Sequence, residues 1–224
     1  MSEPLVRTMT GQITARIREK ILTGVYAPGS PLLQDSIAAE FGVSKIPVRE
    51  ALVQLRSEGL VDIFAHRGFQ VRAVSANEMQ EVFRLRLSLE PTAVADGARK
   101  ASDEDRAASA GALSALNQAL ADGDLRNSGD LNSAFHLALV VPRLQPVTSE
   151  TLSRLHILSQ RYVRMHLQPA GRAKRAIKEH TLLHAAWTAR NIKEARQLCQ
   201  AHIEETQHEL SEALAMKLSD ARRP

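Results

Sequence analysis

The chain has 224 residues, enough for two small domains, and its 44% hydrophobic and 24% charged residues are typical of a soluble globular protein. A net charge of +4 is too small to indicate nucleic-acid binding by itself, so the placement of the cations must decide that question. One cysteine excludes an intramolecular disulfide framework. No apolar run approaches the ~20 residues of a membrane-spanning helix, and the N-terminus lacks the apolar core of a signal peptide. We therefore expect a cytoplasmic protein with no membrane partner.

The first part of the chain contains two helix patterns separated by a turn. Isoleucines recur every four residues within 12–22, which predicts an amphipathic helix that ends at Thr23-Gly24. Residues 27–30, Ala-Pro-Gly-Ser, are typical of a turn, and a second short helix is predicted over 35–41. Gly42-Val43 is then the tight turn into a third helix.

The third helix combines an apolar stripe with a basic face. Ser44 is a favourable N-cap residue, Pro47 falls in the first turn, and Gly59 supplies the C-terminal stop. The predicted buried stripe consists of Val48, Ala51, Leu52 and Leu55. At ~100° per residue, three cations project from one face beside that stripe: Lys45, Arg49 and Arg56. A short helix of this kind is suited to the major groove of DNA.

Two β-rich runs after this helix, over 60–64 and 69–74, predict a hairpin. They flank a turn with two potential cations at its tip, His66 and Arg67, followed by Gly68. Such a ribbon can reach a groove or a phosphate beside the third helix. The pattern is therefore that of a winged helix-turn-helix.

Residues 11–74 resemble the N-terminal domain of the GntR family of bacterial transcription regulators. The matching residues are Pro28-Gly29, Leu33, Phe41-Gly-Val-Ser44, Pro47-Val-Arg-Glu-Ala-Leu52, Leu55, Glu58-Gly-Leu-Val61, Arg67-Gly68 and Val71. The resemblance implies a DNA-binding domain over 1–74, with contacts from Ser44, Lys45, Arg49, Arg56, His66, Arg67 and Gly68. One departure is Lys45-Ile46, where the family commonly has Arg-Thr. Lysine loses bidentate geometry and isoleucine lacks a hydroxyl for phosphate, so we expect an operator sequence different from the family's usual one.

Residues 75–224 show no strand pattern and predict an all-α antiparallel helical bundle. Ser75 and Glu78 have the spacing of a capping box, so the first helix of the bundle begins directly after the wing. Six helices are expected: about 77–100 with a kink near Pro91, 102–122, 124–141, 145–168, 170–189 and 192–218. The predicted fold class is mainly α, with a winged helix-turn-helix domain over 1–74 and a helical bundle domain over 75–224.

The helical half resembles the FCD effector domain of the FadR-type branch of the GntR family. The residues that carry this resemblance are Arg86-x-x-x-Glu90-Pro91, Asn132-x-x-Phe135-His136, Glu179-His180 and Ala195 through His202-Ile203. Six helices rather than seven are similar to the VanR subgroup. The resemblance implies a domain that binds a small effector and forms a homodimer, which would place two recognition helices on a short inverted repeat.

Helical spacing brings four polar side chains of the bundle together. Asn132 and His136 are four residues apart on one predicted helix and share a face. His180 lies as far before Asn191 as His202 lies after it, so a hairpin that turns at Asn191 puts both histidines at one level. If the third helix of the bundle packs there, three imidazoles and an amide oxygen converge, as a transition metal requires. The alternative is that these are ordinary packing or surface histidines.

The same four positions match the Asp-and-three-His metal site of the family, with Asn132 where many relatives have aspartate. The resemblance implies a divalent transition metal, zinc or nickel, held by Asn132, His136, His180 and His202. A neutral amide binds a cation less tightly than a carboxylate and leaves the pocket more positive, which favours an anionic effector; a metal-free pocket is the alternative. The remaining histidines of the bundle are interpreted as packing or solvated residues: His156, His166, His184 and His208.

Arg86 stands where members of the family often present an arginine to the effector. It also lies one turn before Glu90, so the alternative is an ordinary surface ion pair worth only a few tenths of a kcal/mol.

Together these features predict a one-component transcription regulator and not an enzyme. Its expected partners are double-stranded operator DNA, a small organic acid as effector and a second copy of the chain. One alternative is a metal-ion-sensing regulator that needs no organic effector. A metal-dependent hydrolase on a DNA-binding module is disfavoured, because no Asp or Glu stands at general-base spacing near the proposed ligands.

Overall fold

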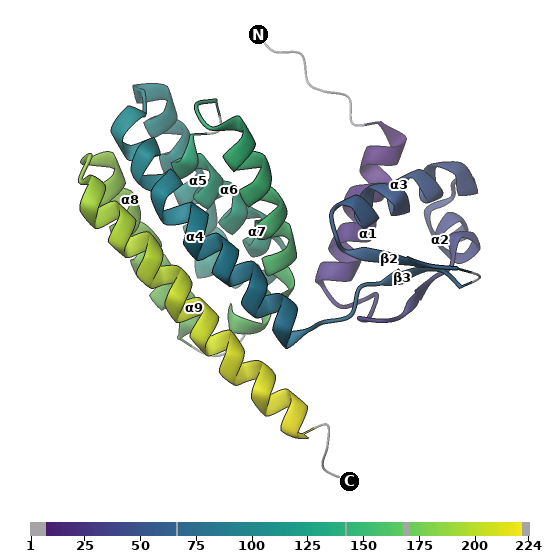
Figure 1. Cartoon of the computed structure of the whole chain (residues 1–224). Coiled ribbons are helices and arrows are strands. Elements are labelled where there is room, and N and C mark those ends of the chain that lie inside the picture. Colours follow the sequence, from purple (N-terminus) through teal and green to yellow (C-terminus); the bar gives the residue numbers. More distant parts are fainter. Residues whose placement is uncertain (1–7, 66, 142, 168–170, 221–224) are drawn as a thin grey trace. The chain divides into compact units, whose positions relative to one another are not determined.

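The computed structural model describes residues 8–65, 67–141, 143–167 and 171–220, and the chain divides into two compact units, 1–74 and 75–224 (Figure 1). The described residues are mainly helical with one small sheet, which confirms the predicted fold class. Within them, no helix is both long enough and apolar enough to span a membrane.

The first unit is built on three helices: α1 (Met9–Leu22), α2 (Gln34–Phe41) and α3 (Lys45–Ser57). Helix α1 begins earlier than predicted because the Thr8 hydroxyl accepts a hydrogen bond from Gly11 N at 3.1 Å and caps the helix there. The predicted apolar positions form the core between α1 and α3; the residues buried there are Ile13, Ile17, Ile21, Val48, Ala51, Leu52 and Leu55. The pattern of apolar residues therefore predicted the core of this unit correctly.

Glycines in the left-handed conformation end two of these helices. After α3, Gly59 has φ 80°, and Leu60 N donates to Leu55 O at 3.0 Å while Gly59 N donates to Arg56 O at 3.0 Å. This pair of bonds is a Schellman motif, and Gly42, with φ 66°, ends α2 in the same way. Ser44 occupies the N-cap position of α3, but its hydroxyl makes no capping hydrogen bond.

The wing belongs to a three-stranded antiparallel sheet in the order β1-β3-β2. Strands β2 (Val61–Phe64) and β3 (Gly68–Val71) pair from Val61↔Val71 to Phe64↔Gly68, so the ladder ends at Val71 rather than at Val74. Strand β1 (Pro31–Leu32), which pairs with Gln70 and Phe69, was not predicted from the sequence. Two residues are too few to produce alternation, and a proline at the start suits only an edge strand.

In the described part of the second unit, all six predicted helices are present (Figure 1). They are α4 (Ala76–Lys100), α5 (Asp103–Ala121), α6 (Leu125–Val140), α7 (Pro146–Leu167), α8 (Arg172–Thr188) and α9 (Ile192–Asp220). The Ser75 hydroxyl caps α4 by accepting from Glu78 N at 3.3 Å, and the helix runs through Pro91 as one element. Helix α4 contacts α6, α7 and α9, so its side chains are covered from several directions.

Three local features position the helices that carry the site. Gly97 lets α4 approach the end of α6, because a Cβ at this position would lie 2.0 Å from the Leu139 carbonyl oxygen. The same oxygen accepts a hydrogen bond from Trp187 Nε1 of α8 at 3.0 Å. Helices α8 and α9 form a hairpin in which Arg190 has φ 56° and Asn191 N donates to Ala186 O at 2.9 Å.

Candidate metal centre and nucleic-acid interface

The α8–α9 hairpin brings two histidines into contact. The Nε2 atoms of His180 and His202 lie 3.3 Å apart, because both residues are equally far from the turn at Asn191. His136 of α6 completes the group, with its ring centroid 5.3 Å from that of His180 and 5.2 Å from that of His202. One ring nitrogen from each of the three lies within 4.8 Å of the other two. The structure therefore collects the three predicted histidine ligands in one place.

A small cavity adjoins this group. Its volume is about 20 Å³, which is room for about one water molecule. Polar and charged side chains line it together with apolar ones; the polar set is Arg86, Asn132, Glu179, His180, His202 and Thr206. Asn132 is only 9% exposed, and it lines the same cavity as His180 and His202.

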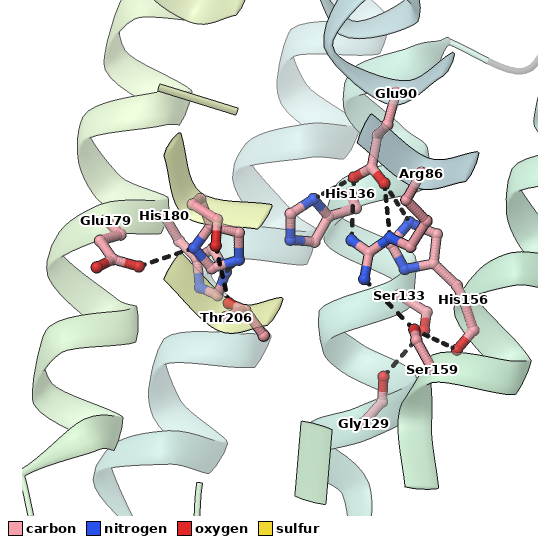
Figure 2. A network of polar contacts seen from close by, with 11 residues as sticks. Arg86, Glu90, Gly129, Ser133, His136, His156, Ser159, Glu179, His180 and Thr206 are labelled. Carbon is pink, nitrogen blue, oxygen red and sulfur yellow. Dashed lines mark hydrogen bonds and ion pairs between the residues drawn. The ribbon is translucent and has the colours of Figure 1, made fainter. Parts of the chain in front are cut away.

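Two carboxylates stand behind the histidines. His136 Nδ1 lies 2.7 Å from Glu90 Oε1 (Figure 2). His202 Nδ1 lies 2.8 Å from Glu179 Oε2. When a carboxylate holds one ring nitrogen of a histidine as N–H, the other nitrogen keeps its lone pair for a cation. Nε2 of His136 and Nδ1 of His180 have no hydrogen-bond partner within the described residues. These orphaned buried nitrogens fit a transition-metal ion.

Arg86 and Glu90 form a buried ion pair on α4, so the alternative of an ordinary surface pair is wrong. Arg86 is 2% exposed and Glu90 is 0% exposed. Arg86 Nε donates to Glu90 Oε2 at 2.9 Å, and its Nη1 donates to Ser159 Oγ at 3.4 Å. Both side chains are buried because α6, α7 and α9 pack against α4. The spacing of residues within one helix does not reveal such packing.

His156 of α7 is the main residue that the sequence analysis missed. It is 1% exposed and its Nε2 lies 3.3 Å from Glu90 Oε2, so it does have converging partners. Glu90, His136 and His156 offer three ligand-type atoms within 4.8 Å of one another. Figure 2 shows His136 between His156 and His180. No helical spacing could identify His156, since its partners come from α4 and α6.

Burial and charge keep two imidazoles of the site, those of His136 and His180, neutral. Burial lowers the pKa of His136 from 6.5 to about 3, against the opposite effect of Glu90. Burial, assisted by His202 and His136, lowers the pKa of His180 well below its ordinary value. Burial raises the pKa of the Glu90 carboxyl, but Arg86 and the neighbouring imidazoles together hold it well below its ordinary value. His136 and His180 are thus neutral imidazoles, as metal ligation requires, beside an ionised Glu90.

Two other histidines lie apart from the centre, as interpreted from the sequence. His184 is half-buried, and its Nε2 lies 3.0 Å from Ser109 Oγ. His208 is exposed, with Nε2 3.4 Å from Glu212 Oε1. Neither residue belongs to the groups of ligand-type side chains found among the described residues.

The predicted DNA-contacting residues that the structure describes are exposed: Ser44, Lys45, Arg49, Arg56, Arg67 and Gly68. Lys45 of the first turn of α3 is paired with Asp35 of α2. Gly68 has φ 72° at the start of β3, a conformation that favours glycine in the wing turn. His66 lies outside the described residues.

Comparison with known proteins identifies the class. Residues 9–71 match the bacterial regulatory proteins of the gntR family, and residues 81–205 match the FCD domain. The chain therefore belongs to the GntR family of bacterial transcription regulators, in the branch that carries a helical FCD domain. It is a transcription regulator and not an enzyme, with a DNA-binding helix-turn-helix followed by an FCD effector domain.

Relatives match over most of the chain. The HTH-type transcriptional regulator McbR of Escherichia coli K12 is 29% identical over 199 residues, which cover 88% of this chain and 89% of that protein. BphR of Paraburkholderia xenovorans LB400, an uncharacterized HTH-type transcriptional regulator, is 30% identical over 209 residues, 89% of this chain and 84% of that protein. The solved structure of E. coli McbR/YncC has a TM-score of 0.76 at 26% identity and covers 94% of this chain and 99% of that one.

Proposed function

We propose that this regulator binds operator DNA as a homodimer and that its bundle holds one divalent transition metal, zinc or nickel, which takes part in binding a small organic acid. The observation that carries the proposal is the convergence of His136, His180 and His202 within 4.8 Å of one another. Three imidazoles are a common ligand set for zinc and suit nickel equally.

The surroundings of the three histidines support a metal rather than simple packing. Glu90 and Glu179 contact the far ring nitrogens of His136 and His202 at 2.7 and 2.8 Å, the arrangement that orients metal-binding imidazoles in known sites. Asn132 lines the same cavity and would supply an amide oxygen. Because that ligand is neutral, a bound divalent ion would keep more of its positive charge than it would beside an aspartate.

The excess positive charge favours an anion as effector. Arg86 lines the cavity, but Glu90 already neutralises much of its charge, so a carboxylate bound there would compete with Glu90 for the guanidinium. Three histidine ligands leave coordination positions that a carboxylate oxygen can occupy. The classes of acid that fit this chemistry are sugar acids, dicarboxylates and aromatic acids.

The size of the cavity favours a second candidate function, in which the metal ion itself is the signal. A volume of about 20 Å³ accommodates a water or an ion, whereas an organic acid requires its lining side chains to move apart. An effector can shift a regulator between two arrangements only if it binds one of them more tightly. An organic acid would favour the arrangement in which the cavity is open. An ion alone would favour the arrangement in which α6, α8 and α9 are drawn together.

One experiment distinguishes these functions. Protein purified without a His tag is analysed for metal, then stripped with chelator and reloaded with zinc or nickel. An operator is obtained by selection from random duplex DNA, and its affinity is measured for the stripped protein, the metal-loaded protein, and the loaded protein with each acid. About one metal per chain and an affinity that changes only when acid is added support the main proposal. An affinity that follows metal alone supports the metal sensor, and the absence of both responses contradicts both.

A further inference from the structure

The first turn of α3 presents a large aliphatic side chain to solvent. Ile46 is 71% exposed, and Lys45 and Arg49 beside it are exposed as well. Val53, two turns further along, is 48% exposed and continues the same line. Together with four polar neighbours these two residues line a groove on α3; the lining residues are Ile46, Arg49, Glu50, Val53, Gln54 and Ser57.

Exposure by itself says little, because single apolar side chains are common on protein surfaces. The position of Ile46 is informative. At ~100° per residue, Ile46 points away from the buried stripe around Val48 and Leu52, and ~60° from Arg49 one turn later. The first turn of a recognition helix is the part that contacts base edges in the major groove. In a helix that enters the major groove in this way, an aliphatic side chain there, flanked by cations that attract the phosphate backbone, would face the bases.

Among the groups that the four base pairs present in the major groove, the C5-methyl of thymine is the apolar one. An isoleucine at a base edge has no donor or acceptor to satisfy, so it loses nothing by excluding water from that methyl group. A base that presents an amino group or an unpaired acceptor to Ile46 would lose its hydrogen bonds to water. The side chain therefore discriminates in favour of thymine.

We propose that Ile46 is a specificity-determining residue that selects thymine in each half of the operator by packing against its C5-methyl group. Arg49, next to it, supplies the polar contact to an adjacent base or phosphate. Lys45 is paired with Asp35, which reduces its contribution to the same surface. This inference rests on the proposed binding of operator DNA through α3.

The test uses the full-length chain and removes the methyl group from the DNA as well as the side chain from the protein. Operators are selected from random duplex DNA with the wild type. Each thymine is then replaced singly by deoxyuridine, which has the same hydrogen-bonding groups but no C5-methyl. The wild type should lose about fourfold in affinity at one thymine of each half-site, as expected for burying one methyl group. Ile46→Ser should bind the thymine and deoxyuridine operators alike.

Two further variants keep the test decisive. Ile46→Val retains a branched side chain and should restore the preference for thymine, while Val147→Ala, which changes an exposed aliphatic residue of α7, should keep the full wild-type preference. Ile46→Ser should keep its thermal stability, because the replaced side chain is exposed, and its salt dependence of binding, because no cation is removed.

The possible results distinguish the role of Ile46 from the proposed binding of operator DNA. If the wild type selects no sequence from the pool, the proposed operator binding is wrong, and the role of Ile46 with it. If it selects an operator but deoxyuridine weakens wild type and Ile46→Ser equally, or weakens neither, operator binding stands and the role of Ile46 is overturned.

Discussion

Oε1 of Glu90 lies 2.7 Å from Nδ1 of His136, and neither side chain is exposed to solvent. Glu90 also accepts hydrogen bonds from Arg86, so one buried carboxylate connects the arginine on α4 with a histidine of the candidate metal centre on α6. This arrangement leaves Nε2 of His136 for a cation and makes the affinity of the centre depend on a residue that would not touch the ion.

Glu90→Gln should weaken zinc binding by about 10–100-fold, because the amide holds the N–H of His136 less strongly than a carboxylate does. It should also lower the free energy of unfolding by about 3–5 kcal/mol, because Arg86 is left buried without a counter-charge. Chelator competition and urea denaturation measure the two effects. The double variant Arg86→Met/Glu90→Gln separates them, since it should regain stability but not zinc affinity. Wild-type zinc affinity in both variants would contradict the role of Glu90.

His180→Ala should lose the metal and show no rise in melting temperature when zinc is added, because an ion stabilises only the state that binds it. His184→Ala is the matched control: it lies one turn further along α8, and its Nε2 contacts Ser109 Oγ rather than the cluster. It should keep wild-type metal content and the zinc-dependent rise. Elemental analysis and thermal denaturation measure both. Stoichiometric metal in a triple His136/His180/His202→Ala variant would show that the ion binds elsewhere.

Arg49→Ala should weaken operator binding by roughly 1–3 kcal/mol if the guanidinium contacts a base, with relaxed selectivity at that position. If Arg49 contacts a phosphate instead, all sequences should weaken alike and the salt dependence should become shallower. Arg99→Ala, which removes an exposed arginine of α4, is the control and should bind as the wild type does. Titration of selected and scrambled duplexes at several salt concentrations distinguishes the cases. A folded Arg49→Ala with unchanged affinity would exclude this face of α3 from the interface.

Gly97→Ala should destabilise the bundle by about 1–3 kcal/mol or more, because the new Cβ would lie 2.0 Å from the Leu139 carbonyl oxygen and force α4 and α6 apart. Gly111→Ala on the exposed side of α5 is the control. Its Cβ would meet nothing within 4 Å, so it should be neutral or stabilise by about 0.5–1 kcal/mol. Urea denaturation of both variants tests this; equal stabilities would contradict the close helix crossing.

Arg143→Ala should destabilise the chain near neutral pH and have no effect in acid. The hydrogen bond from Arg143 lowers the pKa of Asp105 from 3.8 to about 2, with burial opposing and Ser102 assisting. A carboxyl with a lowered folded-state pKa stabilises the fold above its unfolded pKa, and that stabilisation disappears as the pH falls from about 4 toward 2. Denaturation curves of wild type and Arg143→Ala should therefore differ at about pH 6 and converge toward pH 2. A difference independent of pH would mean that Arg143 acts through packing alone.

The sequence determined the helices and the local geometry of each unit. Isoleucines at every fourth position defined α1, Gly59 ended α3, and the equal distances of His180 and His202 from Asn191 predicted their contact across the α8–α9 hairpin. These are properties of single helices or of neighbours joined by a short turn. Helical periodicity and the backbone conformation of a turn depend on residues a few positions apart, so both can be predicted from the sequence.

Which polar groups are buried together depends on how the helices pack in three dimensions. Arg86 and Glu90 have the spacing of a surface ion pair, yet α6, α7 and α9 cover α4 and remove both from water. His156 reaches Glu90 from α7 across the bundle, and the edge strand at Pro31–Leu32 exists only because β3 offers it a partner. Burial and contact between distant segments depend on how whole helices and strands pack, and no local repeat in the sequence encodes which side of a helix its neighbours will cover.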